Sequence, residues 1–67
     1  MISQTIFNVK NVRARRWNPE NANAVALDIE CNDGDIEQTL FFGYGPESAS
    51  KASQFFYALG GKQEDVL

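Results

Sequence analysis

The sequence contains no histidine and a single cysteine, Cys31, and these shortages argue against several kinds of site. One thiol cannot form a disulfide within the chain, and without histidine it cannot complete a zinc site. The common nucleophile–base pairs also use histidine, so we expect no enzymatic catalysis, no metal and no cofactor. Ser48, Ser50 and Ser53 have no base at a suitable spacing and are expected on a helix surface.

Long apolar runs are also missing, and no stretch approaches the ~20 residues that a membrane-spanning helix needs. The N-terminus has neither the charged start nor the continuous apolar segment of a signal peptide. A lone cysteine at an inward-facing position suits a reducing compartment and a buried, unreactive thiol. We therefore expect a cytoplasmic protein that does not bind a membrane.

The chain has 67 residues, and we expect one domain over residues 1–67. A chain of this size buries only about 60% of the surface that its unfolded form exposes, so its stability margin is small. Small domains are commonly stabilised further by disulfides, by a metal or by association with another chain. Since the composition argues against the first two, self-association or docking on a partner remains.

Charge is unevenly distributed along the chain. The first 19 residues contain no acid, whereas residues 20–67 contain all nine acids and only two lysines, Lys51 and Lys62. The basic residues of the first part are Lys10, Arg13, Arg15 and Arg16. Such asymmetry is typical of an interaction surface, and equally typical of a first strand whose charges complement those of the second.

The clearest structural signal is a pair of alternating runs on either side of Asp33-Gly34. Asp-Gly favours a two-residue hairpin turn, because Gly accepts positive φ freely and Asp tolerates it. The predicted pairs are Cys31 with Ile36, Ile29 with Gln38, Leu27 with Leu40, and Val25 with Phe42. Nearly all apolar side chains then share one face of the sheet. The other face carries Asp28, Glu30, Glu37 and Thr39.

The first 14 residues predict a strand with one irregularity. Phe7 and Val9 share one parity of the alternation, whereas Val12 and Ala14 share the other. One extra residue near Lys10-Asn11 restores a single inward face, so we predict a β-bulge there. Residues 15–23 follow as a predicted loop, because they are rich in turn-forming residues.

A helix is predicted from Pro46 to Leu59. Proline suits the first helical turn, where its missing N–H costs nothing, and Glu47 complements the positive end of the helix dipole. The apolar positions Ala49, Ala52, Phe55, Phe56 and Leu59 have helical spacing. Gly60-Gly61 predicts the end of the helix in a left-handed cap.

These elements together predict an α+β fold. Its architecture is a three-stranded antiparallel β-meander followed by one C-terminal helix packed on one face, in the order βββα. The helix is expected to cover the face formed by Val25, Leu27, Ile29, Leu40 and Phe42. The opposite face then stays open.

The sequence matches neither a calcium-binding EF-hand loop nor a dinucleotide-binding fingerprint. An EF-hand loop with Gly34 in its sixth place needs acids or amides at 29, 31 and 33 and Glu at 40. Ile29, Cys31 and Leu40 do not meet that requirement. Gly43-Tyr44-Gly45 lacks the third glycine and the parallel βαβ setting of a dinucleotide-binding fingerprint, so it indicates a strand-to-helix turn.

Residues 13–17 are the most suggestive part of the sequence for binding, since they combine Arg13, Arg15 and Arg16 with Trp17. Guanidinium groups beside an indole are typical of surfaces that hold phosphates and stack bases. The structural interpretation is that Arg13 and Arg15 lie across from acids of the second strand, Asp28 and Glu30, and relieve repulsion between Glu30 and Glu37. We favour the structural interpretation, because a pI near 4.6 is far from that of a nucleic-acid-binding domain.

The open face completes the functional prediction. Ala24, Ala26 and Phe41 are expected to form an apolar strip there, and exposed apolar patches mark interfaces. We predict a non-enzymatic binding protein that docks on a larger protein, or on a second copy of itself, through this face. The predicted contacts are Arg13, Arg15, Arg16, Trp17, Phe41, Asp28 and Glu30. The alternative is a single-stranded nucleic-acid-binding domain that uses Arg13, Arg15, Arg16, Trp17 and Phe41.

Size and composition also suggest a biological setting for such a protein. A small, acidic chain without catalytic residues is compatible with an accessory protein of viral or plasmid type that inhibits a larger host machine. Because an acidic surface can imitate nucleic acid, that machine is expected to handle DNA or RNA.

Overall fold

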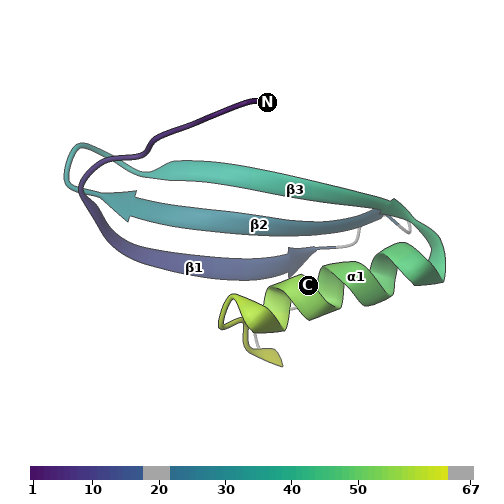
Figure 1. Ribbon diagram of the computed structural model, residues 1–67. Helices are drawn as coiled ribbons and strands as arrows, with labels where there is room; N and C mark the ends of the chain where they lie inside the picture. Colours follow the sequence, from purple (N-terminus) through teal and green to yellow (C-terminus); the bar gives the residue numbers. More distant parts are fainter. Residues whose placement is uncertain (18–21, 64–67) are drawn as a thin grey trace.

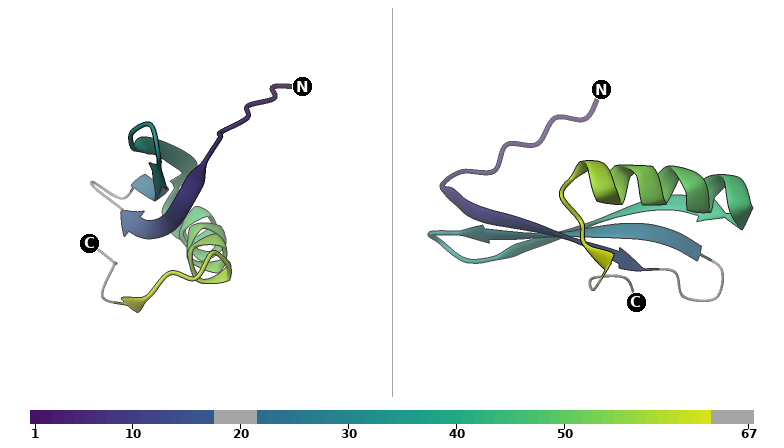
Figure 2. Two further views of the ribbon diagram at one scale, coloured as in Figure 1. Left: turned by 90° about the vertical axis from the view of Figure 1, so that its left-hand side faces the viewer. Right: turned by 90° about the horizontal axis from the view of Figure 1, so that it is seen from below.

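Three antiparallel strands and one C-terminal helix make up the fold, as the sequence predicts (Figure 1). The computed structural model describes residues 1–17 and 22–63. The strands β1 (Val9–Trp17), β2 (Ala22–Cys31) and β3 (Ile36–Tyr44) form a sheet in the order β1-β2-β3. The helix α1 (Gly45–Ala58) packs on one face of this sheet (Figure 2).

The hairpin between β2 and β3 differs from the prediction by two residues. Ile29 pairs with Ile36, and Leu27 pairs with Gln38, so the tight turn at Asp33-Gly34 is not formed. The Gly34 N–H donates instead to the Cys31 carbonyl over 3.3 Å, which centres the turn one residue earlier. The physical reason is that a type I′ turn needs positive φ at both central residues, and Asp33 does not adopt it. Since the shift is even, the side chains from Ile36 to Phe41 keep their predicted faces.

Strand β1 starts and ends later than predicted, although its bulge is confirmed. The register with β2 shifts between Val9 and Asn11, so Lys10 is the extra residue. The strand then continues to Trp17, through positions that were predicted to be a loop. Backbone pairing with β2 as far as Ala24 accounts for this extension. The turn predicted at Asn18-Pro19 lies outside the described residues.

Residues 1–7, which were predicted to belong to the first strand, are not in a strand. They turn away from β1 at Asn8, the one described non-glycine residue with positive φ. A side-chain hydrogen bond from Gln38 Nε2 to Gln4 Oε1 joins this segment to β3. Apart from this contact the segment runs away from the sheet (Figure 2), and Met1, Ile2 and Phe7 are exposed.

Helix α1 begins and ends one residue earlier than the sequence predicts. Pro46 lies in its first turn, and Gly60 takes a φ of +83° after its last turn. The Gly61 N–H donates to the Phe56 carbonyl over 2.8 Å and the Gly60 N–H to the Tyr57 carbonyl over 3.1 Å, which is the Schellman pattern. At position 61, a Cβ atom would lie 2.4 Å from the Phe56 ring, so the backbone packs directly on that ring.

The core lies between α1 and one half of the sheet. Ala14, Val25, Ala52 and Phe56 form its buried centre, and Leu27 and Phe42 pack against them. The helix covers only the part of the sheet next to its own start (Figures 1 and 2). Leu40 faces the helix side as predicted but is 40% exposed, so the expectation that the helix covers it is only partly met.

Candidate binding surface

The face of the sheet turned away from α1 is formed by alternate residues of all three strands, and it is termed the open face. Its residues are Asn11, Arg13, Arg15 and Trp17 of β1, Ala24, Ala26, Asp28 and Glu30 of β2, and Glu37, Thr39 and Phe41 of β3. Successive side chains of an extended strand point to opposite faces, so the residues between them turn toward the helix. In the described part of the chain, no helix or strand covers the open face (Figure 2).

One end of the open face is aromatic. The strand register places Ala24 between Trp17 and Phe41, and these two rings are 45% and 58% exposed. Tyr44 joins them, with its ring centroid 5.4 Å from that of Phe41 and an interplanar angle of 78°. Ala24 and Ala26 are buried beneath larger neighbours, so they form a floor and not the exposed strip that was predicted.

Tyr44 was not among the predicted contacts, because simple alternation assigns Phe41 and Tyr44 to opposite faces. A second register shift, between Asn23 and Ala24, makes Phe42 an extra residue of β3 and brings Tyr44 opposite Ala22. Gly43 permits this irregularity with a φ of +121°. The adjacent glycines of Gly43-Tyr44-Gly45 were the one sequence signal that an irregularity was near.

The other end of the open face is charged. Asp28 and Glu37 lie directly opposite each other in the register, which brings two like charges together. Arg15 joins both: its Nε donates to Asp28 Oδ2 over 2.5 Å, and its Nη2 donates to Asp28 Oδ1 and Glu37 Oε2, each over 3.0 Å. The hydrogen bond with Asp28 and the charge of that carboxylate raise the pKa of Arg15 above its ordinary value.

The predicted relief of repulsion by arginine is therefore present, with different partners. The sequence pairs Glu30 with Glu37, whereas the register pairs Asp28 with Glu37 and places Asn11 beside Glu30. Arg15 reaches Asp28 diagonally, because its direct neighbour on β2 is Ala26. The two-residue shift of the hairpin accounts for the exchange of partners.

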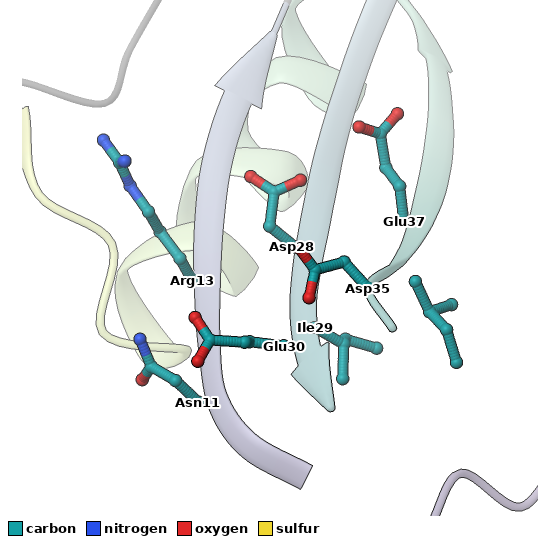
Figure 3. Close-up of a pocket in the computed structure, with 8 residues that line it drawn as sticks. Asn11, Arg13, Asp28, Ile29, Glu30, Asp35 and Glu37 are labelled. Carbon is teal, nitrogen blue, oxygen red and sulfur yellow. The ribbon is translucent and has the colours of Figure 1, made fainter. Parts of the chain in front are cut away.

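A hollow of about 440 Å³ lies at the charged end of the sheet. Figure 3 shows the side chains around it, with Glu30 extending toward Asn11, and Asp28 and Glu37 projecting from neighbouring strands. Its lining is acidic, since Asp28, Glu30, Asp35 and Glu37 outnumber Arg13. Among residues 1–17 and 22–63, no three acidic or sulfur ligands are placed to hold a metal ion.

Arg16 does not lie on the open face, which corrects its inclusion among the predicted surface contacts. It sits opposite Val25 on the helix side and is only 5% exposed. The parity of β1 explains this position, because Arg16 follows Ala14 by two residues and Ala14 belongs to the core. The structure thus brings together six of the seven predicted contacts, adds Tyr44 and removes Arg16.

Comparisons with known proteins add no assignment, since no family model, curated protein or solved structure matches this chain. None of the described helices is both long and apolar enough to cross a membrane. What the open face can bind therefore has to follow from its own geometry and charge.

Proposed function

We propose that this domain is a non-enzymatic binding protein that docks on a larger protein through the open face. The observation that carries the proposal is the cluster of Trp17, Phe41 and Tyr44, three aromatic rings exposed together on a face that no described helix or strand covers. Clustered apolar exposure of this kind marks interaction sites. Tyrosine and tryptophan are also the residues that most often dominate the energy of protein–protein contacts.

The shape of the aromatic end supports docking by a protein side chain. Ala24 and Ala26 provide a low, buried floor, and the rings of Trp17 and Phe41 stand on the neighbouring strands beside it. An apolar side chain of a partner that enters this space loses its contact with water on all sides. Rigid backbone pairing below the rings keeps the entropic cost of binding small, because the anchors lie on strands and not on a loop.

Charge indicates the chemistry of the partner. The charged end contains the acids Asp28, Glu30 and Glu37 against Arg13 and Arg15, and the whole chain carries a net charge of −3. Charges around an interface steer the encounter and select the partner more than they add affinity. The matching surface is therefore an apolar projection bordered by basic residues, as on a protein that itself handles nucleic acid. Docking there would act by covering or tethering that partner.

Direct binding of single-stranded nucleic acid is the weaker alternative. Arg15 is engaged by two carboxylates and Arg16 is buried, so two of the three arginines meant for phosphate are used inside the protein. The remaining acids of the open face repel phosphate. Under this alternative, oligonucleotide would quench Trp17 fluorescence at low salt, and binding would fall steeply as salt rises.

The Phe41→Glu variant tests the proposal. Wild-type protein is used to capture a partner from the native host, the partner is purified, and its affinity is measured by calorimetry with each variant. Phe41→Glu is expected to abolish binding while circular dichroism stays unchanged, because it places a charge in the apolar centre of the contact. Phe7→Glu is the matched control, since Phe7 is exposed but lies outside the open face.

Three results would contradict the proposal. The first is unchanged affinity in Phe41→Glu, which removes the open face as the contact. The second is a wild-type protein that captures nothing and remains monomeric by light scattering. The third is salt-sensitive quenching of Trp17 by an oligonucleotide, which transfers the same face to the nucleic-acid alternative.

A further inference from the structure

Arg16, a buried arginine on the helix side of the sheet, has no role in the proposed docking function. Arg16 lies between β2 and α1, and its guanidinium donates to two backbone carbonyls, of Trp17 over 3.0 Å and Ala24 over 3.2 Å. Nη2 donates to Asn23 Oδ1 over 2.9 Å. Its Nε is buried and has no hydrogen-bond partner among residues 1–17 and 22–63. The side chain is thus held in place by neutral oxygens, and these hydrogen bonds use three of its five N–H donors.

The charge of Arg16 is also uncompensated within the described residues. A guanidinium stays protonated at every pH that proteins tolerate, so it cannot escape burial by becoming neutral. The described ion pairs join Arg15 to Asp28 and Glu37, on the opposite face of the sheet, and Arg16 forms none. Buried charges are normally paired, because removing an ion from water without a counter-ion is strongly unfavourable.

A cavity of about 270 Å³ adjoins this side chain. Arg16 and Asn23 line it from the sheet, and the helix contributes Ala49, Ser53, Phe56 and Tyr57, with Gln63 beyond its end. The Tyr57 hydroxyl donates to Gln63 Oε1 over 2.8 Å, which ties Gln63 to the helix side of this cavity. The cavity therefore combines one cation and the polar side chains of Asn23, Ser53 and Gln63 with an aromatic wall.

We propose that this cavity binds a small organic carboxylate through Arg16. One positive charge balances a monoanion, whereas a phosphate dianion would need further cations that the lining does not contain. The Phe56 and Tyr57 rings provide the apolar contact that an inorganic ion cannot use. A volume just below the range of ordinary ligand pockets suits an acid of a few carbon atoms.

The carboxylate has two possible sources with the same chemistry. It is either a free acid from solution or an acid of the chain itself, since Glu64 and Asp65 directly follow Gln63 in the sequence. Both residues lie outside the described residues. The test therefore compares the wild-type chain with a Glu64→Gln/Asp65→Asn variant.

Titration with butyrate and benzoate, followed by ¹H–¹⁵N NMR, tests the proposal directly. The Arg16 Nε–H resonance is expected to shift and saturate with either acid. Butyramide and benzamide, which have the same shapes without the charge, should leave it in place. The Arg15 Nε–H is the internal control, because it is already bound to Asp28 on the other face. An Arg16→Gln variant that still folds should bind at least about tenfold more weakly, since it lacks the charge-assisted contact.

The outcomes separate the two sources and can also refute the proposal. A shift in the wild-type chain supports a free acid as the ligand. A shift only in the Glu64→Gln/Asp65→Asn variant supports the carboxylate site with the chain's own acids as its occupants. If the Arg16 resonance moves in neither protein, or moves equally with the amides, the proposal is wrong. None of these results depends on the open face.

Discussion

At the scale of single residues, two phenylalanines with opposite surroundings separate stability from binding. Phe56 is fully buried against Val25 and Ala14, whereas Phe41 is 58% exposed on the open face. The same residue type thus serves the core in one place and the candidate interface in the other. Truncation of each side chain should therefore produce different effects.

Phe56→Ala is expected to destabilise the fold by about 3–5 kcal/mol, the usual cost of emptying a buried aromatic site. A core of this size rarely supplies more than about 3–5 kcal/mol in total, so the variant should be largely unfolded at 25 °C. Phe41→Ala should cost no more than about 1 kcal/mol, because little area is lost from the core. Urea denaturation followed by circular dichroism measures both. Similar losses in the two variants would contradict the described core.

Arg15 provides a second test at this scale. Its guanidinium lies between Asp28 and Glu37, so Arg15→Gln leaves two carboxylates facing each other without a cation. The unfolding midpoint of this variant should fall at low salt. The difference from the wild type should shrink in 1 M salt, where the Debye length is about 3 Å. A salt-independent difference would mean that the arginine acts through packing of its stem.

At the scale of elements, the end of α1 depends on a close backbone contact. A methyl group at Gly61 would lie 2.4 Å from Phe56 Cε1, so the ring would have to leave its place in the core. Gly61→Ala is therefore expected to cost about 1–3 kcal/mol, as overpacked core sites do. Gly60→Asn is the control, because asparagine tolerates positive φ and nothing lies within 4 Å of an added Cβ there. Thermal unfolding should rank Gly61→Ala well below Gly60→Asn, and the reverse order would contradict the described cap.

Local sequence patterns predicted the order and type of the strands and the helix correctly. The errors lie at a turn and at a bulge, where the backbone torsion angles determine the register. Helical spacing and Gly60-Gly61 predicted α1 correctly, and a parity change at Lys10 predicted the first bulge. The turn at Asp33-Gly34 was misplaced because the sequence does not reveal the φ that Asp33 adopts. The second bulge, at Phe42, interrupts a run that alternates regularly, so periodicity alone could not find it.

For the candidate surface too, local patterns predicted some residues correctly and others depended on the folded structure. Alternation was enough to place Arg15, Asp28 and Phe41 on one face, whereas Trp17 lay in the predicted loop. Arg16 was expected at the surface because residues 15–23 were predicted to be a loop, whereas β1 continues through it and alternation from Ala14 turns it toward the helix. Burial of a cation depends on hydrogen bonds from residues distant in sequence, such as Asn23, which only the folded chain reveals.

At the scale of the whole molecule, stability should differ between the two halves of the sheet. The helix packs over the half that contains Val25, whereas Ile36, beside the hairpin turn, is 37% exposed. Amide hydrogen exchange should therefore be slowest around Val25 and faster around Ile36, because local opening follows the amount of buried contact. NMR exchange rates measure this directly. Equal protection along β2 and β3 would show that the sheet opens only as a unit.

The even register shift at the hairpin also has a consequence for how this chain tolerates changes in length. Adding or removing two residues within 32–35 leaves every pair of β2 and β3 on its own side of the sheet. A one-residue insertion, unless a new bulge absorbs it, exchanges the two faces of β3 relative to β2, so that Leu40 turns toward the open face and Phe41 toward the helix side. Natural variants of this protein should therefore differ at this turn by even numbers of residues.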